Sequence, residues 1–195
     1  MEHRKEEPGD GDRNLRIYEA LLKRGEELDV RGQFYYAREL LSHGAHARAE
    51  AAFRAFLDRP DGWVENRLQA CRDLAACLEA QGRRQEAKEA LVHSFAWDLP
   101  RGETCCDLAA LEAGDGRWEQ ALYWYGAALR APQRSRSGAF VHPPSYGYIP
   151  CLGMCLCCDH LGRRAEAQDW NERAALYWPA SPAVAWNRRY FAEPE

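Results

Sequence analysis

The sequence has no long apolar run and no excess of basic residues. No stretch approaches the roughly 18 apolar residues that a membrane-spanning helix needs. The formal net charge of -4 and the pI near 5.9 give no electrostatic basis for binding nucleic acid. The charged segment 1–12 lacks the apolar core of a signal peptide. These absences predict a cytoplasmic protein without a nucleic-acid or membrane partner.

The sequence also lacks a constellation of residues for catalysis. Its six histidines are scattered along the chain, without a nucleophile and base in a recognisable arrangement. The triplet Asp10-Gly11-Asp12 has the Asp-x-Asp form that holds a metal on a diphosphate, but no strand precedes it to position the carboxylates. We therefore expect no catalytic residue, no cofactor and no enzymatic activity from this chain on its own.

Eight cysteines raise the question of a metal or redox site. Cys71, Cys105 and Cys151 each lie eleven residues before a glycine of the repeat described below, and Cys155 occupies one of its small-residue positions. Equivalent positions in a helical repeat indicate packing, where cysteine behaves as a small apolar residue. Because Cys151, Cys155 and Cys158 share a helical face, a metal or redox site is the alternative; we expect no metal ligands.

The sequence does contain a repeated glycine–alanine pattern. Each of four glycines is followed five residues later by alanine and preceded by a small residue seven positions earlier. The glycines are Gly44, Gly82, Gly116 and Gly162, at spacings of 38, 34 and 46 residues. A period near 34 predicts a solenoid of helical hairpins, in which glycine ends the first helix and small residues lie where the helices approach. Such arrays usually bind other proteins.

The expected architecture is an all-α solenoid of about four repeats, with an extra N-terminal helix and a C-terminal capping helix. A flexible leader at 1–12 precedes a repeat domain at 13–195, which has an insertion at about 133–147. Ser181 and Pro182 form a good start for the last helix. The expected helices cover residues 14–25, 30–43, 47–57, 63–80, 85–97, 102–113, 118–129, 148–160, 165–177 and 182–191.

At these repeat positions the chain resembles a tetratricopeptide repeat array. The matching features are the small residue of the first helix, the glycine between helices, and alanine followed by an aromatic residue or leucine in the second helix. Two repeats depart from the pattern, since Phe56 stands where alanine is usual and Asn171 stands in the aromatic position. The resemblance covers about residues 30–180 and implies a protein-interaction scaffold.

Further stretches stand out away from the repeat positions, at residues 14–19, 34–40, 62–65, 98–101, 146–150 and 186–188. In this order they resemble the region that follows the catalytic domain in bacterial family 2 glycosyltransferases with C-terminal tetratricopeptide repeats. The resemblance implies an accessory region that holds an acceptor or dimerises. The alternative is a fragment or split subunit of a nucleotide-sugar transferase that acts only with its catalytic half.

The candidate binding site is the groove formed by the first helices of the repeats, and its expected ligand is a protein or peptide. Arg38 and Arg72, with Phe34, suit an acidic or C-terminal peptide group, because a guanidinium binds carboxylate through two hydrogen bonds. The alternative is that both arginines pair with acidic neighbours on a solvated face. The predicted groove residues are Arg31, Phe34, Arg38, Arg72, Glu79 and Glu103.

Aromatic residues supply two further hypotheses. A surface for stacking a sugar or peptide is predicted around the insertion. The alternatives are that these aromatic residues are buried in the core, or that the insertion closes over the junction of repeats three and four. The residues of this surface are Trp124, Phe140, Tyr146 and Tyr148. A homodimer is the other hypothesis, since exposed aromatic clusters mark interfaces. Its seam would contain Trp178, Trp186, Tyr190 and Phe191.

Overall fold

A computed structural model describes residues 12–133 and 140–193 of the chain. These residues form ten α-helices, two short 3-10 helices and no strand, which confirms the predicted all-α fold. Most of the expected leader at 1–12, and residues 134–139 of the expected insertion, lie outside the described part. The chain divides into two compact units, residues 1–87 and 88–195, and each is described by itself.

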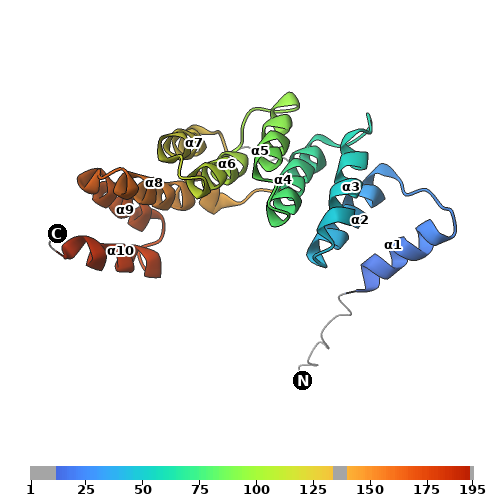
Figure 1. The fold of residues 1–195 in the computed structure, drawn as a ribbon, viewed down its shortest axis with the longest axis horizontal. Coiled ribbons are helices and arrows are strands. Elements are labelled where there is room, and N and C mark those ends of the chain that lie inside the picture. Colours follow the sequence, from blue (N-terminus) through green and yellow to red (C-terminus); the bar gives the residue numbers. More distant parts are fainter. Residues whose placement is uncertain (1–11, 134–139, 194–195) are drawn as a thin grey trace, which may run out of the picture. The chain divides into compact units, whose positions relative to one another are not determined.

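The helices follow one another in hairpins within each unit (Figure 1). The first unit contains α1 (Arg13–Lys23), α2 (Val30–Ser42), α3 (His46–Leu57) and α4 (Val64–Ala80). Helix α5 (Arg84–His93) crosses the boundary between the units. The second unit contains η1 (Ser94–Ala96), α6 (Gly102–Gly114), α7 (Trp118–Arg130), η2 (Pro143–Tyr146), α8 (Tyr148–His160), α9 (Arg164–Tyr177) and α10 (Pro182–Ala192).

The glycine of each hairpin ends its first helix, as predicted. Gly44, Gly82, Gly116 and Gly162 have φ angles between 69° and 76°, a left-handed conformation that disfavours residues with a Cβ. After Gly44, the N–H of the next residue donates to the carbonyl of Leu40 over 2.9 Å, and the other three glycines have the equivalent bond. This is the Schellman arrangement, which satisfies the last carbonyls of the helix and turns the chain into the second helix.

The small residues of the pattern lie inside the hairpins. Ala49, Ala87, Ala121 and Ala167 are fully buried, and Cys155 is 2% exposed at its small-residue position. The helix pairs α2/α3, α6/α7 and α8/α9 are in contact (Figure 1). Because a larger side chain at these positions would push the paired helices apart, the pattern is explained by close packing.

A buried arginine holds the turn between α3 and α4 in the first unit. The side chain of Arg67 donates over 3.0 Å to the carbonyls of Leu57 and Gly62, and it also donates to the carbonyl of Arg59. Arg67 is only 7% exposed. Its guanidinium therefore satisfies backbone acceptors that the end of α3 would otherwise leave without partners.

The departure from the repeat pattern at Asn171 has a structural reason. Its side-chain amide donates to the carbonyl of Val184 over 3.3 Å, and its carbonyl oxygen accepts from Asn187 over 2.9 Å. Both partners lie on α10, whose first turn is capped by the Ser181 hydroxyl. A polar residue in the usual aromatic position thus attaches the terminal helix to α9.

Within the described ranges, no helix has the length and apolar character that crossing a bilayer requires.

Candidate functional site

The first helix of each hairpin, here called an A helix, carries the predicted groove residues. In the first unit, the A helices α2 and α4 are joined by an ion pair of 3.3 Å between Arg38 Nε and Asp73 Oδ2. The guanidinium of Arg38 also lies over the ring of Phe34, at 5.7 Å from its centroid. Phe34 itself is fully buried and packs against Phe56, so the ring beneath the Arg38 guanidinium is fixed in position.

The polar network continues along α4. Gln69 donates to Asp73 Oδ1 over 2.7 Å and accepts from Arg72 over 3.4 Å. Asp73 thus pairs directly with Arg38, as the alternative of an acidic neighbour anticipated, and it reaches Arg72 through Gln69. We name Arg38, Gln69, Arg72 and Asp73 the arginine network; all four are half-buried.

The remaining predicted groove residues have partners of their own. Arg31 lies over the ring of Tyr35 at 5.6 Å, and Glu79 pairs with Arg84 over 3.7 Å. Glu103 belongs to the second unit, where it is 3% exposed.

Glu103 is held by the insertion. Its Oε1 atom accepts the backbone N–H of His142 over 2.7 Å, and its Oε2 atom accepts the hydroxyl of Tyr146 over 2.6 Å. The thiol of Cys106, one turn further along α6, donates to the carbonyl of Ser145 over 3.4 Å. The segment 142–146 therefore lies against the A-helix face of α6, and we call this contact the α6 site.

The α6 site is closely packed. A Cβ placed on Gly102 would lie 2.8 Å from the carbonyl oxygen of Ser145 and 2.9 Å from the ring of Tyr146. Burial raises the pKa of Tyr146, and its hydrogen bond to Glu103 raises it further. The hydroxyl of Tyr146 therefore keeps its proton at neutral pH and acts as the donor.

The other predicted aromatic residues have different neighbours. The Tyr148 hydroxyl lies 2.6 Å from Ser181 Oγ, and its ring lies 5.3 Å from that of Trp178. Trp124 is half-buried, with its ring centroid 5.2 Å from that of Tyr123 and 6.1 Å from that of Phe95. Phe140 is also half-buried.

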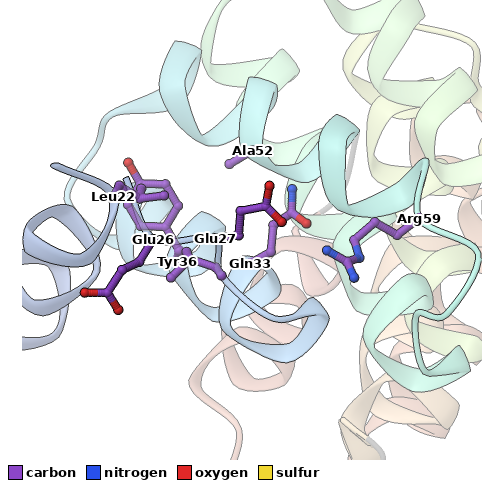
Figure 2. Close-up of a pocket in the computed structure, with 8 residues that line it drawn as sticks. Leu22, Glu26, Glu27, Gln33, Tyr36, Ala52 and Arg59 are labelled. Atoms are coloured by element: carbon purple, nitrogen blue, oxygen red, sulfur yellow. The ribbon is translucent and has the colours of Figure 1, made fainter. Parts of the chain in front are cut away.

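The first unit contains a pocket that the sequence did not indicate. It lies beside the C-terminal part of α1 and has a volume of about 350 Å³ (Figure 2). Its lining combines apolar groups with charged and amide groups, and Arg59 in this lining is held by hydrogen bonds of 3.1 Å to both carboxylate oxygens of Asp61. The lining residues are Leu22, Glu26, Glu27, Leu28, Gln33, Tyr36, Ala52 and Arg59. They come from α1, α2, α3 and two loops, so no local motif could have revealed the pocket.

The exposed aromatic residues of the predicted seam lie at the C-terminal end of the second unit. Trp178, Trp186 and Tyr190 are 49%, 58% and 40% exposed, and Phe191 is half-buried. The rings of Trp186 and Tyr190 stack with centroids 5.5 Å apart and an interplanar angle of 6°. Arg164 lies over the rings of Tyr190 and Phe191, at 5.4 Å from each.

The cysteines are packing residues in this structure. All eight are buried with free thiols. Burial raises their pKa values, to about 12 for Cys71, Cys106 and Cys155. Although Cys155 and Cys158 have the C-x2-C spacing, no group of three or more metal-ligating side chains occurs in the described part of the chain.

No protein-family model and no curated protein matches this sequence. Solved structures do match the fold. A crystal structure of MamA is 16% identical with a TM-score of 0.68, and the match covers 94% of this chain and 92% of that one. YrrB, a TPR protein with an unusual peptide-binding site, is 14% identical with a TM-score of 0.62, over 89% of this chain and 80% of its own.

TTC0263, a thermophilic TPR protein of Thermus thermophilus, gives a TM-score of 0.60 at 16% identity, over 94% of this chain and 90% of its own. At identities this low, the matches establish architecture and no more. Together with the hairpins described above, they show that the chain has a TPR-like helical-repeat fold.

Proposed function

We propose that this chain is a non-catalytic interaction scaffold that binds an acidic or C-terminal segment of a partner protein through the arginine network. The observation that carries this proposal is the bridge from Arg38 to Asp73, continued through Gln69 to Arg72. It orders two guanidinium groups on neighbouring A helices. Ordered guanidinium groups lose less entropy when they bind a carboxylate, which favours tighter binding.

The charge balance favours an anionic ligand. Arg31, Arg38 and Arg72 carry three positive charges on this face, against the negative charges of Asp73 and Glu79. Glu79 is itself paired with Arg84. A peptide carboxylate can therefore join the network as a second acceptor for Arg38 or Arg72. YrrB, a TPR protein of similar fold, has a peptide-binding site, which supports a peptide as the ligand of this scaffold.

The test uses a fluorescein-labelled pentaglutamate peptide with a free C-terminus, its amidated form, and pentalysine as the charge control. We expect only the glutamate peptides to bind, more weakly at higher salt because exposed charges are screened. Arg38→Ala and Arg72→Ala should each weaken binding about tenfold, since each removes a charge-assisted hydrogen bond. The affinity of Arg38→Lys should lie between those of the wild type and Arg38→Ala, because lysine lacks the fork geometry of the guanidinium.

Arg54→Ala is the matched control, because Arg54 lies on α3 and pairs with Glu50. Equal binding by the wild type and a folded Arg38→Ala, Arg72→Ala double variant would remove this proposal. Circular dichroism of Arg54→Ala and of the double variant shows whether the helices are retained.

We also propose that the scaffold works in the cytoplasm as the accessory region of a bacterial family 2 glycosyltransferase, either within the enzyme or as its split subunit. The stretches 62–65 and 146–150 are among those that support this relationship, and eight free cysteines suit a reducing compartment. A nucleotide-sugar domain encoded in frame upstream of the Met1 codon would support the proposal. An unrelated upstream coding sequence, and no co-purifying transferase, would count against it.

A homodimer is the second candidate, favoured by the exposed stack of Trp186 and Tyr190. Association through this face would bury aromatic surface that a terminal repeat usually keeps polar. Light scattering over a concentration series should then show a dimer in the wild type and a monomer in Trp186→Ala. Tyr123→Ala, at an exposed tyrosine on α7, is the control. A wild-type monomer throughout would exclude this function.

A further inference from the structure

We propose that the α6 site is a recognition site for a tyrosine-bearing peptide of a partner protein, and that the chain's own segment 142–146 occupies it as an internal ligand. This inference goes beyond the arginine network, because it uses residues of the second unit only. It states what the site recognises: a free backbone N–H followed four residues later by a tyrosine hydroxyl.

The first argument is the position of Glu103. It lies on the A helix α6, at a position that the sequence predicts to face the groove, and it is only 3% exposed. Both hydrogen bonds that the structure gives its carboxylate come from the segment, at 2.7 Å and 2.6 Å. A buried carboxylate is costly without such donors. When the segment leaves, Glu103 therefore favours a ligand that supplies the same two donors.

The second argument is how the segment binds. It contacts α6 through a backbone N–H, a carbonyl and one side-chain hydroxyl, which are the groups that a bound peptide presents. Ser145 and Tyr146 are the residues of the segment that pack against α6. Ser145 is only 3% exposed, whereas His142 and the two prolines that follow it are exposed. A hydrogen bond within the segment, between His142 Nδ1 and Ser145 Oγ at 3.0 Å, stabilises the turn.

The third argument is the shape of the site. Gly102 brings the backbone of α6 against Ser145 and the ring of Tyr146, leaving no room for a Cβ. The ring thus lies against the backbone of α6 at Gly102, and its hydroxyl reaches Glu103. This geometry selects a flat side chain with a terminal donor, which is the description of tyrosine.

The tethered segment competes with any partner. A tether gives its ligand a high effective concentration, so an external peptide binds only in proportion to the fraction of open sites. Weakening the internal ligand should therefore strengthen external binding. Tyr146→Phe does this, since it keeps the ring and removes only the hydrogen bond to Glu103.

The experiment measures binding of a labelled peptide with the sequence of residues 140–147 to the full chain. We expect Tyr146→Phe to bind it about tenfold more tightly than the wild type, as the loss of one charged hydrogen bond implies. The same peptide with phenylalanine in place of tyrosine should bind the variant about tenfold more weakly. Adding Glu103→Gln to Tyr146→Phe should weaken binding of the tyrosine peptide to a similar extent.

Equal affinity of the wild type and Tyr146→Phe, or binding insensitive to Glu103→Gln, would overturn the proposal. Hydrogen exchange on the wild type gives a test that needs no variant: excess tyrosine peptide should speed exchange of the His142 amide, and the phenylalanine peptide should not. An unchanged rate would also overturn it.

A different outcome is that the wild type forms a dimer and Tyr146→Phe does not. Two copies would then exchange the segment 142–146, and the partner of the α6 site would be a second copy of this chain instead of a separate protein. Arg38→Ala should leave this binding unchanged, which separates the proposal from the arginine network.

Discussion

The hydroxyl of Tyr146 donates a 2.6 Å hydrogen bond to Oε2 of Glu103, 43 positions earlier in the chain. The contact joins the end of η2 to the first turn of α6. Because His142 donates to the other carboxylate oxygen, one glutamate holds both ends of the segment 142–146. The described segment 142–146 is therefore packed against α6.

This contact predicts a loss of stability at alkaline pH. The pKa of Tyr146 is raised above its ordinary value of 10.0, first by burial and then by the bond to Glu103. The folded state thus holds this proton more tightly than the unfolded state. The resulting stability is complete below about pH 10 and is lost as pH rises through the folded pKa.

Urea denaturation at several pH values between about 8 and 11 measures this effect. The free energy of unfolding should fall more steeply above pH 10 in the wild type than in Tyr146→Phe. Tyr125, whose pKa burial also raises, contributes equally to both proteins. Identical slopes for the two proteins would contradict a buried, hydrogen-bonded Tyr146.

Features that depend on residues close together in the sequence could be predicted, whereas features that depend on residues far apart in the sequence could not. Gly44 ends α2 by a local rule, because its positive φ and its neighbour's hydrogen bond involve residues within one turn. The contact between Glu103 and Tyr146 depends on where the segment 142–146 folds back against α6, and no local pattern in the sequence determines this. The sequence did place both residues on candidate surfaces, although it assigned them to separate ones.

Polar residues in the interior were the features that sequence reasoning missed. Asn171 looks like a degenerate repeat position until α10 is present to accept its hydrogen bond. In the sequence Arg67 looks like an ordinary helix-surface residue. Only the folded turn after α3 brings its three carbonyl acceptors to the guanidinium. The repeat register assigned four cysteines to packing positions, and the structure buries all four: Cys71, Cys105, Cys151 and Cys155.

The cysteines should be unreactive in the folded protein. Burial holds the pKa of Cys157 near 12 and that of Cys105 near 11, so almost no thiolate forms at about pH 8. A thiol-reactive dye should modify none of the eight cysteines in the native chain and all eight in denaturant. Ser42→Cys, at an exposed position, should react at once. Fast labelling of a native cysteine would show that its helix opens readily.

Two glycines in neighbouring helices should respond to alanine in opposite directions. A Cβ on Gly153 of α8 would lie 2.2 Å from the ring of Tyr125, which is itself buried. Gly153→Ala should therefore destabilise the protein by about 1–3 kcal/mol through overpacking. A Cβ on Gly126 of α7 would meet only the flexible end of Arg130, at 3.3 Å.

Gly126→Ala should stabilise α7 by about 0.5–1 kcal/mol, because alanine loses less backbone entropy in a helix. Thermal and urea unfolding of the two variants measure the difference. Equal effects on stability would mean that α8 can move away from Tyr125, and that the packing between the third and fourth repeats is looser than described.

The final prediction concerns the buried guanidinium of Arg67. Arg67→Met keeps much of the side-chain length but removes the donors to the carbonyls of Leu57, Arg59 and Gly62. Three backbone acceptors then lack their charged partner, so we expect a loss of about 2–4 kcal/mol in the free energy of unfolding.

Arg54→Met provides the matched comparison in the same unit. Arg54 is exposed and forms a 3.0 Å ion pair with Glu50 one turn earlier in α3. Such surface pairs contribute less than about 1 kcal/mol, and we expect the variant to lose no more than that. A small effect at both arginines would show that water replaces Arg67 at the turn, whereas a large effect only at Arg67 would establish it as the residue that fixes how α4 follows α3.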